Sequence, residues 1–255
     1  MSNGIIPENY NSKNLVQLWR GFIDWEKRRK GEGGFLLDQL RQHKAQKIFD
    51  ASLGDGCDSI YLLKLGFDVT SNEVDQVFLQ QAVENAKREH VALRITSYDW
   101  RNLDKEFPEE SFDAIILLGN SLTYLFIEDD RRHALEQFKR ILKSNGILII
   151  DERNYQYILD RKKEILEGNF QYSGQYVYCG ETVHGTPIEI DEQHVKFEYV
   201  DEASETKGYL TLYPFKRGEL KRVLQNTGFT NVTQYSDYKS AFDLDADFYQ
   251  YVCQK

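Results

Sequence analysis

The stretch IFDASLGDGCDSIYLLKLGFDVTSNE, residues 48–73, decides the fold of this chain. A short apolar run ends at Asp50, a turn passes through Gly54 and Gly56, and apolar residues at helical spacing lead to a second strand that ends in Glu73. A turn without side chains brings backbone amides close to a ligand, and an acid about 20 residues further on can bind both hydroxyls of a ribose. The stretch therefore predicts a nucleoside-binding strand–turn–helix–strand unit.

The residues of the turn favour one kind of nucleoside. A dinucleotide site has the spacing G-x-G-x-x-G, whereas Gly54 and Gly56 are followed here by Ser59. Asp50 at the strand end and Asp55 within the turn would repel a phosphate, but they suit a ligand that carries a sulfonium and an α-amino group. These residues favour S-adenosylmethionine as the ligand, with S-adenosylhomocysteine as the product.

Composition excludes several classes of protein. The chain has 255 residues, enough for one large domain or one domain with an inserted piece, and its net charge of −9 disfavours a nucleic-acid partner. Its three cysteines lie far apart and its five histidines show no ligand spacing with them, so we expect neither a disulfide framework nor a metal. The sequence contains no signal-like N-terminus and no run of about 18 apolar residues, which predicts a cytoplasmic protein without a membrane segment. The oligomeric state stays open.

Strand-like and helix-like patterns alternate along the chain and predict an α/β fold: a doubly wound, mostly parallel seven-stranded Rossmann-like sheet. After the two strands of the opening unit, the expected strands are 93–96, 114–118, 147–150, 231–237 and 248–253. The expected helices include 76–89, 130–142 and 218–227, and two more within 15–40.

Period-two alternation without long helices between 172 and 213 predicts a small antiparallel lid inserted after the fifth strand. We therefore expect an N-terminal helical cap over 1–40, a nucleoside-binding domain made of 41–154 and 214–255, and a lid subdomain over 155–213.

Functional side chains are expected just past the strand ends, because open α/β sheets bind ligands at that edge. Asp99 and Trp100 follow the third strand and could grip an adenine by hydrogen bonding and stacking. Arg153 follows the fifth strand, where its guanidinium could bind a substrate carboxylate at two points. A salt bridge from Arg153 to Asp151 or Glu152 is the structural alternative.

The expected lid is rich in tyrosine. Ring faces and hydroxyls around a sulfonium bind positive charge without supplying a nucleophile, and could align a small amine for in-line attack on the methyl group. Ordinary packing of a β face is the alternative for any one of them. These tyrosines are Tyr172, Tyr176, Tyr178, Tyr199 and Tyr213.

From about Leu18 to its C-terminus the chain resembles the glycine/sarcosine N-methyltransferases. These are S-adenosylmethionine-dependent enzymes of bacterial and archaeal betaine synthesis with the class I methyltransferase fold, and the animal glycine N-methyltransferase is a more distant likeness. The resemblance rests on FIDWEKRRKGEG, DASLGDGCDS, FDVTSNE, YDWRNL, LLGNSLTYLF, DERNYQYIL, YVYCGETV, LTLYPF and DADFYQYV. It implies N-methylation of glycine and sarcosine, towards dimethylglycine and betaine.

The resemblance also implies a set of site residues, to which the turn adds Asp50 and Gly54. The residues implied to hold the donor are Trp19, Trp25, Arg28, Ala51, Glu73, Asp99, Trp100 and Leu118. Those implied to surround the amino acid are Asn120, Arg153, Tyr178, Tyr199 and Tyr213. Two features depart from the family: the turn reads SLGDG in place of an ATGTG-like sequence, and Glu73 replaces the usual aspartate. Helix core and a surface ion pair are the alternative for Trp19, Trp25 and Arg28.

Three other functions stay open from the sequence. The enzyme could methylate sarcosine, dimethylglycine or another small carboxylated amine in preference to glycine. A nicotinamide-dependent oxidoreductase is disfavoured by the missing third glycine. A nucleoside-binding module without catalysis is disfavoured by the polar residues gathered at the strand ends.

Overall fold

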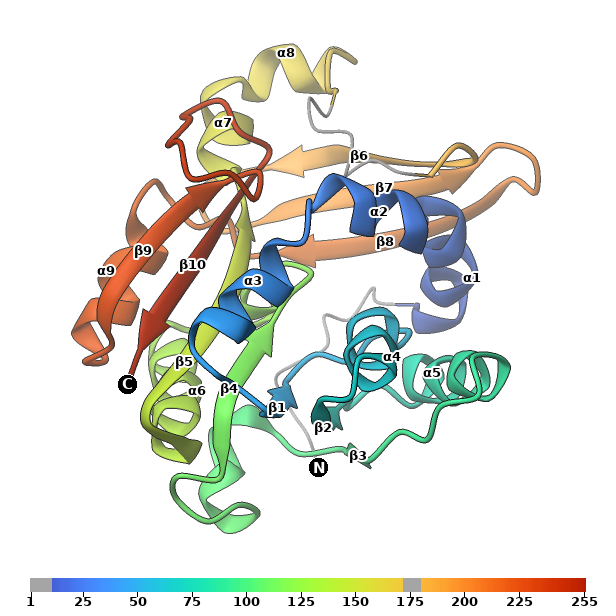
Figure 1. The fold of residues 1–255 in the computed structure, drawn as a ribbon. Helices are drawn as coiled ribbons and strands as arrows, with labels where there is room; N and C mark the ends of the chain where they lie inside the picture. Colours follow the sequence, from blue (N-terminus) through green and yellow to red (C-terminus); the bar gives the residue numbers. More distant parts are fainter. Residues whose placement is uncertain (1–10, 172–179) are drawn as a thin grey trace.

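The computed structural model describes residues 11–171 and 180–255, and in this part of the chain seven strands form one large sheet (Figure 1). β10 runs antiparallel to both of its neighbours, β5 and β9, and the remaining neighbours pair in parallel. The predicted fold class is confirmed. In spatial order the strands are β3 (Ile95–Thr96), β2 (Asp68–Asn72), β1 (Lys47–Asp50), β4 (Phe112–Leu117), β5 (Leu142–Arg153), β10 (Phe248–Gln254) and β9 (Thr230–Ser236).

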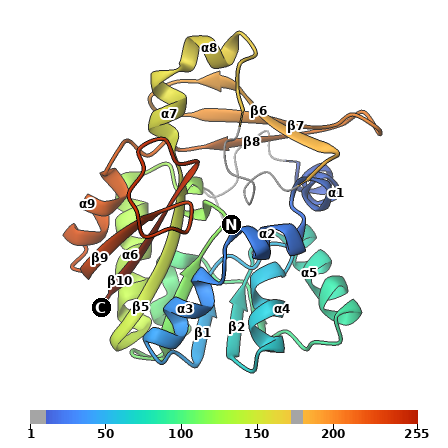
Figure 2. The ribbon, with the colours of Figure 1, turned by 45° about the horizontal axis from the view of Figure 1, so that its top comes forward.

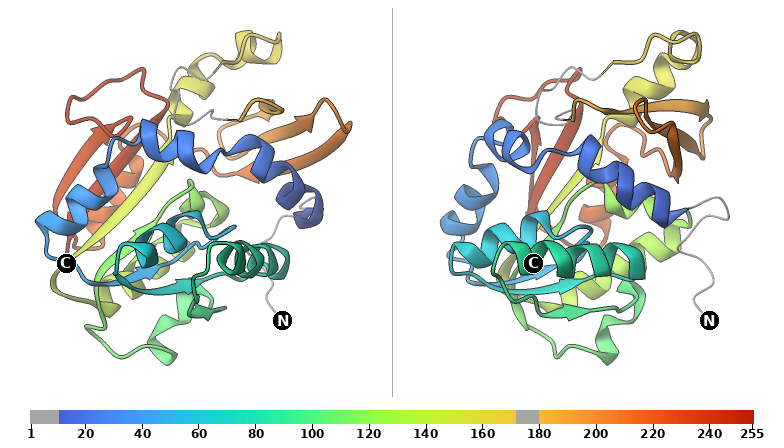
Figure 3. Two further views of the ribbon diagram at one scale, coloured as in Figure 1. Left: turned by 45° about the vertical axis from the view of Figure 1, so that its right-hand side comes forward. Right: turned by 90° about the vertical axis from the view of Figure 1, so that its right-hand side faces the viewer.

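Helices cover both faces of this sheet (Figure 3). α3 (Phe35–Gln42) and α4 (Cys57–Lys64) share one apolar cluster with the sheet, and α6 (Glu128–Ile141) and α9 (Glu219–Asn226) share the cluster on the other face. The central strands are apolar on both sides for this reason: every residue from Ala114 to Leu117 is 0% exposed. α5 (Gln76–Arg88) contacts α1 (Ser12–Phe22) beside the sheet.

The N-terminal region differs from the expectation of two helices. The structure has three, because α1 ends at Phe22 and α2 (Trp25–Gly31) begins anew before α3. Asp24 causes the break: its carboxylate accepts a hydrogen bond from the backbone N–H of Lys27 at 2.9 Å and so caps α2. An aspartate is among the favoured residues at this capping position.

The expected antiparallel insertion is present as a separate three-stranded sheet of β6 (Val183–Ile190), β7 (Val195–Asp201) and β8 (Thr206–Leu212). It lies across one end of the large sheet, with α1 packed against it (Figure 2). α7 (Tyr155–Asp160) and α8 (Lys162–Leu166) come between β5 and this sheet and were not predicted. Tyr172, Tyr176 and Tyr178 lie outside the described residues.

Two boundaries of the large sheet moved. β3 has two residues instead of four, and β5 begins at Leu142, whereas the expected strand began at residue 147. The pairing register of β4 and β5 shifts between Phe112 and Ala114. No helix among the described residues is long and apolar enough to cross a membrane.

Candidate active site

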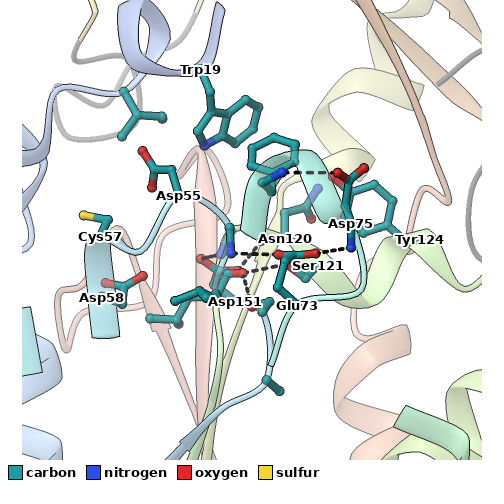
Figure 4. Close-up of a pocket in the computed structure, with 18 of the residues that line it drawn as sticks. Trp19, Asp55, Cys57, Asp58, Glu73, Asp75, Asn120, Ser121, Tyr124 and Asp151 are labelled. Carbon is teal, nitrogen blue, oxygen red and sulfur yellow. Dashed lines mark hydrogen bonds between the residues drawn. The ribbon is translucent and has the colours of Figure 1, made fainter. Parts of the chain in front are cut away.

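A cavity of about 210 Å³ opens at the carboxyl ends of β1, β2, β4 and β5, where residues of the small sheet and of α1 complete its wall (Figure 4). Most of the predicted site residues lie in this wall, although they come from distant parts of the sequence. They are Trp19, Arg28, Ala51, Gly54, Glu73, Trp100, Leu118, Asn120, Arg153 and Tyr199.

Two predicted residues stand directly behind the wall. The indole N–H of Trp25 donates to the carboxylate of Asp55, which does line the cavity, at 3.0 Å. Asp50 is 2% exposed, and its carboxylate accepts hydrogen bonds from the hydroxyl of Ser59 at 2.6 Å and from the backbone N–H of Ser52 at 3.2 Å. Both residues therefore shape the turn and its surroundings from outside the cavity.

Asp99 and Tyr213 do not lie in the cavity wall. The carboxylate of Asp99 faces Arg101, to which it forms a salt bridge of 2.6 Å. Tyr213 donates to Glu219 at 2.8 Å, and its ring lies 3.8 Å below the guanidinium of Arg131. Tyr213 follows the end of β8, and the chain there has left the sheet that borders the cavity. Predicted Tyr178 lies outside the described residues.

The two glycines of the turn have different roles. A Cβ atom on Gly54 (φ +55°) would meet no atom within 4 Å, so this residue faces open space in the cavity. A Cβ atom on Gly56 (φ +94°) would lie 3.0 Å from Ile60 and 3.4 Å from Ala82, so this glycine serves close packing of α4 and α5. Only Gly54 therefore offers room to a ligand.

Glu73 connects the glycine turn to the start of α5 (Figure 4). One carboxylate oxygen accepts from the backbone N–H of Gly54 and the other from that of Asp75, both at 2.9 Å. Burial raises the pKa of Glu73 to about 7. The carboxylate holds the turn and at the same time borders the cavity, as a ribose-binding acid must.

Trp100 stands at the β3 side of the cavity, at the start of the short helix η1 (Trp100–Lys105), and its indole N–H donates to the carbonyl of Ala51 at 2.8 Å. Asn72, which the sequence did not single out, fixes the same loop: its amide oxygen accepts from the backbone N–H of Tyr98 at 2.8 Å, and its amide nitrogen donates to the carbonyl of Tyr98 at 3.0 Å. The signal in the sequence was a polar residue at the end of a predicted strand. In the structure Asn72 is 1% exposed.

Acidic side chains dominate the charge around the cavity. Burial raises the pKa of Asp151 to about 6 and also raises that of Asp55. Asp58 differs, since salt bridges to Arg28 and Arg29 outweigh its burial and hold its pKa at about 2. The wall thus combines the guanidinium groups of Arg28 and Arg153 with several acids, a charge pattern that suits a ligand carrying charges of both signs.

Asn120 and Arg153 lie together at the ends of β4 and β5. The side-chain oxygen of Asn120 accepts from the backbone N–H of Arg153 at 3.0 Å, and its backbone N–H donates to Asp151 at 2.6 Å. The guanidinium of Arg153 lies 4.7 Å from the ring centre of Phe197 and 4.8 Å from that of Phe248. Strand β7 thereby contributes a ring that flanks the guanidinium.

Asp151 and Glu152, the alternative salt-bridge partners of Arg153, accept hydrogen bonds from other groups. Asp151 accepts from the backbone N–H groups of Gly119 and Asn120, and Glu152 accepts from the hydroxyl of Tyr251 at 2.6 Å. Arg153 itself lines the cavity, and its binding of a substrate carboxylate stays a prediction.

Aromatic rings close the side of the cavity towards the small sheet. Tyr199 of β7 is 2% exposed, and its ring centre lies 5.0 Å from that of Phe22 and 6.0 Å from that of Trp19. Tyr124, which the sequence did not single out, also lines the cavity, and burial raises the pKa of its phenol. Tyr124 therefore keeps its proton at neutral pH, since phenols titrate near pH 10 when exposed.

The wall fits S-adenosylmethionine, the donor inferred from the turn. Gly54 faces open space, and Glu73 and Trp100, the predicted partners of the ribose and the base, line the same cavity as acids that would suit a sulfonium and an α-amino group. The described residues hold no group of three or more His, Cys, Asp or Glu side chains positioned for a metal ion.

Comparisons with known proteins identify the family of the chain. Residues 48–146 match the family model of a methyltransferase domain. The chain is 37% identical to the glycine/sarcosine N-methyltransferase of Aphanothece halophytica over 97% of this chain and 91% of that protein, and 38% identical to that of Parasynechococcus marenigrum over 95% and 83%. The solved structure of an S-adenosylmethionine-dependent methyltransferase from Clostridium acetobutylicum superposes with a TM-score of 0.69 at 17% identity, covering 95% of this chain and 96% of that one, which shows the fold. By its likeness to relatives along almost its whole length, the chain belongs to the glycine/sarcosine N-methyltransferase family.

Proposed function

We propose that this protein transfers a methyl group from S-adenosylmethionine to the amine of glycine, and to that of sarcosine. The observation that carries the proposal is the burial of Arg153, a residue 6% exposed, in the cavity wall that also contains Asn120. A carboxylated substrate supplies the charge that a buried guanidinium binds best. The names of the full-length relatives support glycine and sarcosine as the amines.

The donor site consists of residues at the ends of β1, β2 and β3. Glu73 would accept hydrogen bonds from the ribose hydroxyls, and Trp100 would offer an aromatic wall to the adenine. S-adenosylmethionine, when bound, supplies a methyl group on a positively charged sulfur. The acids Asp55 and Asp151 then face a positively charged ligand and favour it electrostatically.

The amine site lies between the end of β5 and the small sheet. Arg153 would bind the carboxylate of glycine, which leaves the amine free to point towards the donor. Tyr199 and Trp19 close this side with rings and exclude water. Orientation of this kind suffices for a direct displacement, which needs no covalent intermediate with the protein. The small sheet would act as the lid of the site.

A nicotinamide cofactor fits the wall less well. Its pyrophosphate would have to approach Asp55 at the glycine turn, where the buried carboxylate would repel it when ionised.

Calorimetric titration with S-adenosylmethionine and with NAD, followed by mass spectrometry of an amine panel, tests the proposal. We expect binding of S-adenosylmethionine alone, and methylated products from glycine and sarcosine. A panel of glycine, sarcosine, dimethylglycine and ethanolamine separates carboxylated from other amines. Binding of NAD, or methylation of ethanolamine in preference to glycine, would contradict the proposal.

A further inference from the structure

A tight turn directly after β9 contains a tyrosine where a glycine is usual. The backbones of Ser236 and Lys239 exchange two hydrogen bonds, of 2.9 and 3.2 Å, around Asp237 and Tyr238. The two central residues have φ of 47° and 60°. Two-residue turns with positive φ at both positions are normally Asn-Gly or Asp-Gly, because a bulky side chain is strained there. Tyr238 occupies the position where glycine is usual, so its backbone is strained by the presence of a bulky side chain.

Strand β10 holds this turn in place. The backbone N–H of Tyr238 donates to the side-chain oxygen of Gln250, a residue 0% exposed, at 2.7 Å. The backbone N–H of Asp237 donates to the carbonyl of Phe248 at 2.9 Å, and the carboxylate of Asp237 accepts from the N–H of Phe248 at 3.0 Å. Hydrogen bonds to β10 thus maintain the strained backbone of this turn. Backbone strain that is maintained in this way often occurs at functional sites.

Tyr238 lines the cavity, together with Arg28 and Asp151. Its ring meets that of Phe35 edge-on at 5.4 Å. Burial raises the pKa of its phenol, and the nearby carboxylates of Glu32 and Asp151 raise it further. The hydroxyl therefore keeps its proton at neutral pH and is a hydrogen-bond donor.

The position of Tyr238 in the fold separates it from the nucleoside end of the cavity. Trp100 follows β3, at one edge of the strand order, whereas Tyr238 lies between β9 and β10 at the other. On the Tyr238 side the wall carries Arg28 and the acids Asp151 and Asp58. Charges of both signs, next to a hydroxyl donor, complement an ammonium and a carboxylate on one carbon.

We propose that Tyr238 binds the amino-acid end of the methyl donor, with its hydroxyl donating to the donor's carboxylate beside Arg28. The inference rests on the proposed function, because it assumes S-adenosylmethionine in the cavity. It adds a binding residue from the C-terminal part of the chain to a donor site otherwise built from the N-terminal helices and the strand ends.

The test uses three ligands and two variants of the full chain. S-adenosylmethionine and S-adenosylhomocysteine carry the amino-acid end, whereas 5′-methylthioadenosine carries the nucleoside and sulfur without it. Tyr238→Phe removes the hydroxyl and keeps the ring. Tyr235→Phe is the matched control, since Tyr235 packs edge-on against the same Phe35 at 4.9 Å but does not line the cavity.

Calorimetry should show that Tyr238→Phe weakens both amino-acid-bearing ligands by roughly 10-fold, the loss of one hydrogen bond to a charged group, and leaves 5′-methylthioadenosine within about 2-fold. Tyr235→Phe should leave all three within about 2-fold. Equal losses for all three ligands in Tyr238→Phe would show a packing role and overturn the inference. An unchanged affinity of Tyr238→Phe for the donor, together with a raised KM for glycine, would also overturn the inference. If the wild-type protein bound none of the three, the proposed function would fail first, and the inference with it.

Discussion

Arg153 carries the choice of substrate at the scale of single residues. Arg153→Leu should leave the affinity for S-adenosylmethionine nearly intact. It should lower kcat/KM for glycine by an amount that corresponds to about 2–5 kcal/mol of lost transition-state stabilisation, because the substrate carboxylate loses its buried partner. Arg153→Lys should also be poor, since an ammonium cannot reproduce a planar two-point contact. Turnover, donor affinity and melting temperature are measured together. A destabilised Leu variant with normal turnover per folded molecule would instead indicate a structural role.

Glu73 is the residue that ties donor binding to the glycine turn. Glu73→Ala removes the acceptor placed for the ribose and should weaken S-adenosylmethionine binding by about 1.5–3 kcal/mol. Its bonds to Gly54 and Asp75 are also lost, so the melting temperature should fall. Calorimetry on the variant checks the affinity, with the exposed Glu84→Ala of α5 as a control. Unchanged affinity would remove Glu73 from the donor site.

The sequence located residues that follow a strand better than residues held by distant contacts. Glu73, Asn120 and Arg153 were found because the carboxyl ends of parallel strands meet at one edge of a sheet. Asn72 was missed because its partner, Tyr98, is 26 residues away. Tyr238 was missed because only the hydrogen bonds of the turn reveal its positive φ.

At the scale of elements, β6 and β7 approach each other closely at Tyr199, a residue of β7 that borders the site. A Cβ atom on Gly185 would lie 2.7 Å from the ring of Tyr199 and 3.4 Å from that of Phe22. Gly185→Ala should therefore displace the Tyr199 ring, destabilise the protein by about 1–3 kcal/mol and raise the KM for glycine. Thr186→Ala, an exposed change on the same strand, is the control.

Thermal unfolding and glycine saturation curves measure both effects of Gly185→Ala. An unchanged KM in a folded variant would mean that the Tyr199 ring does not border the amine. A melting temperature equal to that of Thr186→Ala would mean that β6 and β7 can move apart without loss of stability.

Element type followed from sequence more reliably than element boundaries. The apolar run of β4 and the amphipathic pattern of α6 were unambiguous, because both faces of the strand and one face of the helix are buried. The break between α1 and α2 depends on a single cap, Asp24, inside a pattern that otherwise reads as one helix.

For the whole molecule, the buried acids predict a characteristic pH dependence. Burial raises the pKa of Asp151 to about 6, of Glu73 to about 7 and of Glu152 to about 8, compared with about 4 in an unfolded chain. Folded protein therefore holds protons that unfolded protein releases. The stability from these groups is present below about pH 4 and is lost as the pH rises through about 6 to 8. The melting temperature of the ligand-free protein should fall over that interval.

Donor affinity should change in the opposite direction. As Asp151 and Glu73 ionise, they favour a sulfonium more strongly, so S-adenosylmethionine should gain affinity relative to S-adenosylhomocysteine between about pH 6 and 8. Both ligands carry the same α-amino group, so the ratio of their affinities cancels its titration. Calorimetry at several pH values gives this ratio, and a ratio independent of pH would remove these acids from recognition of the sulfur.

The most direct measurement of the central claim is kcat/KM of the purified protein for glycine and for glycinamide, with S-adenosylmethionine as donor and the methylated product identified by mass spectrometry. Glycinamide keeps the amine and lacks the carboxylate. The account predicts sarcosine from glycine, formed together with S-adenosylhomocysteine, and a preference for glycine of about 100-fold or more, as a buried charge pair implies. Equal turnover of the two amines, or no sarcosine from glycine, would contradict it.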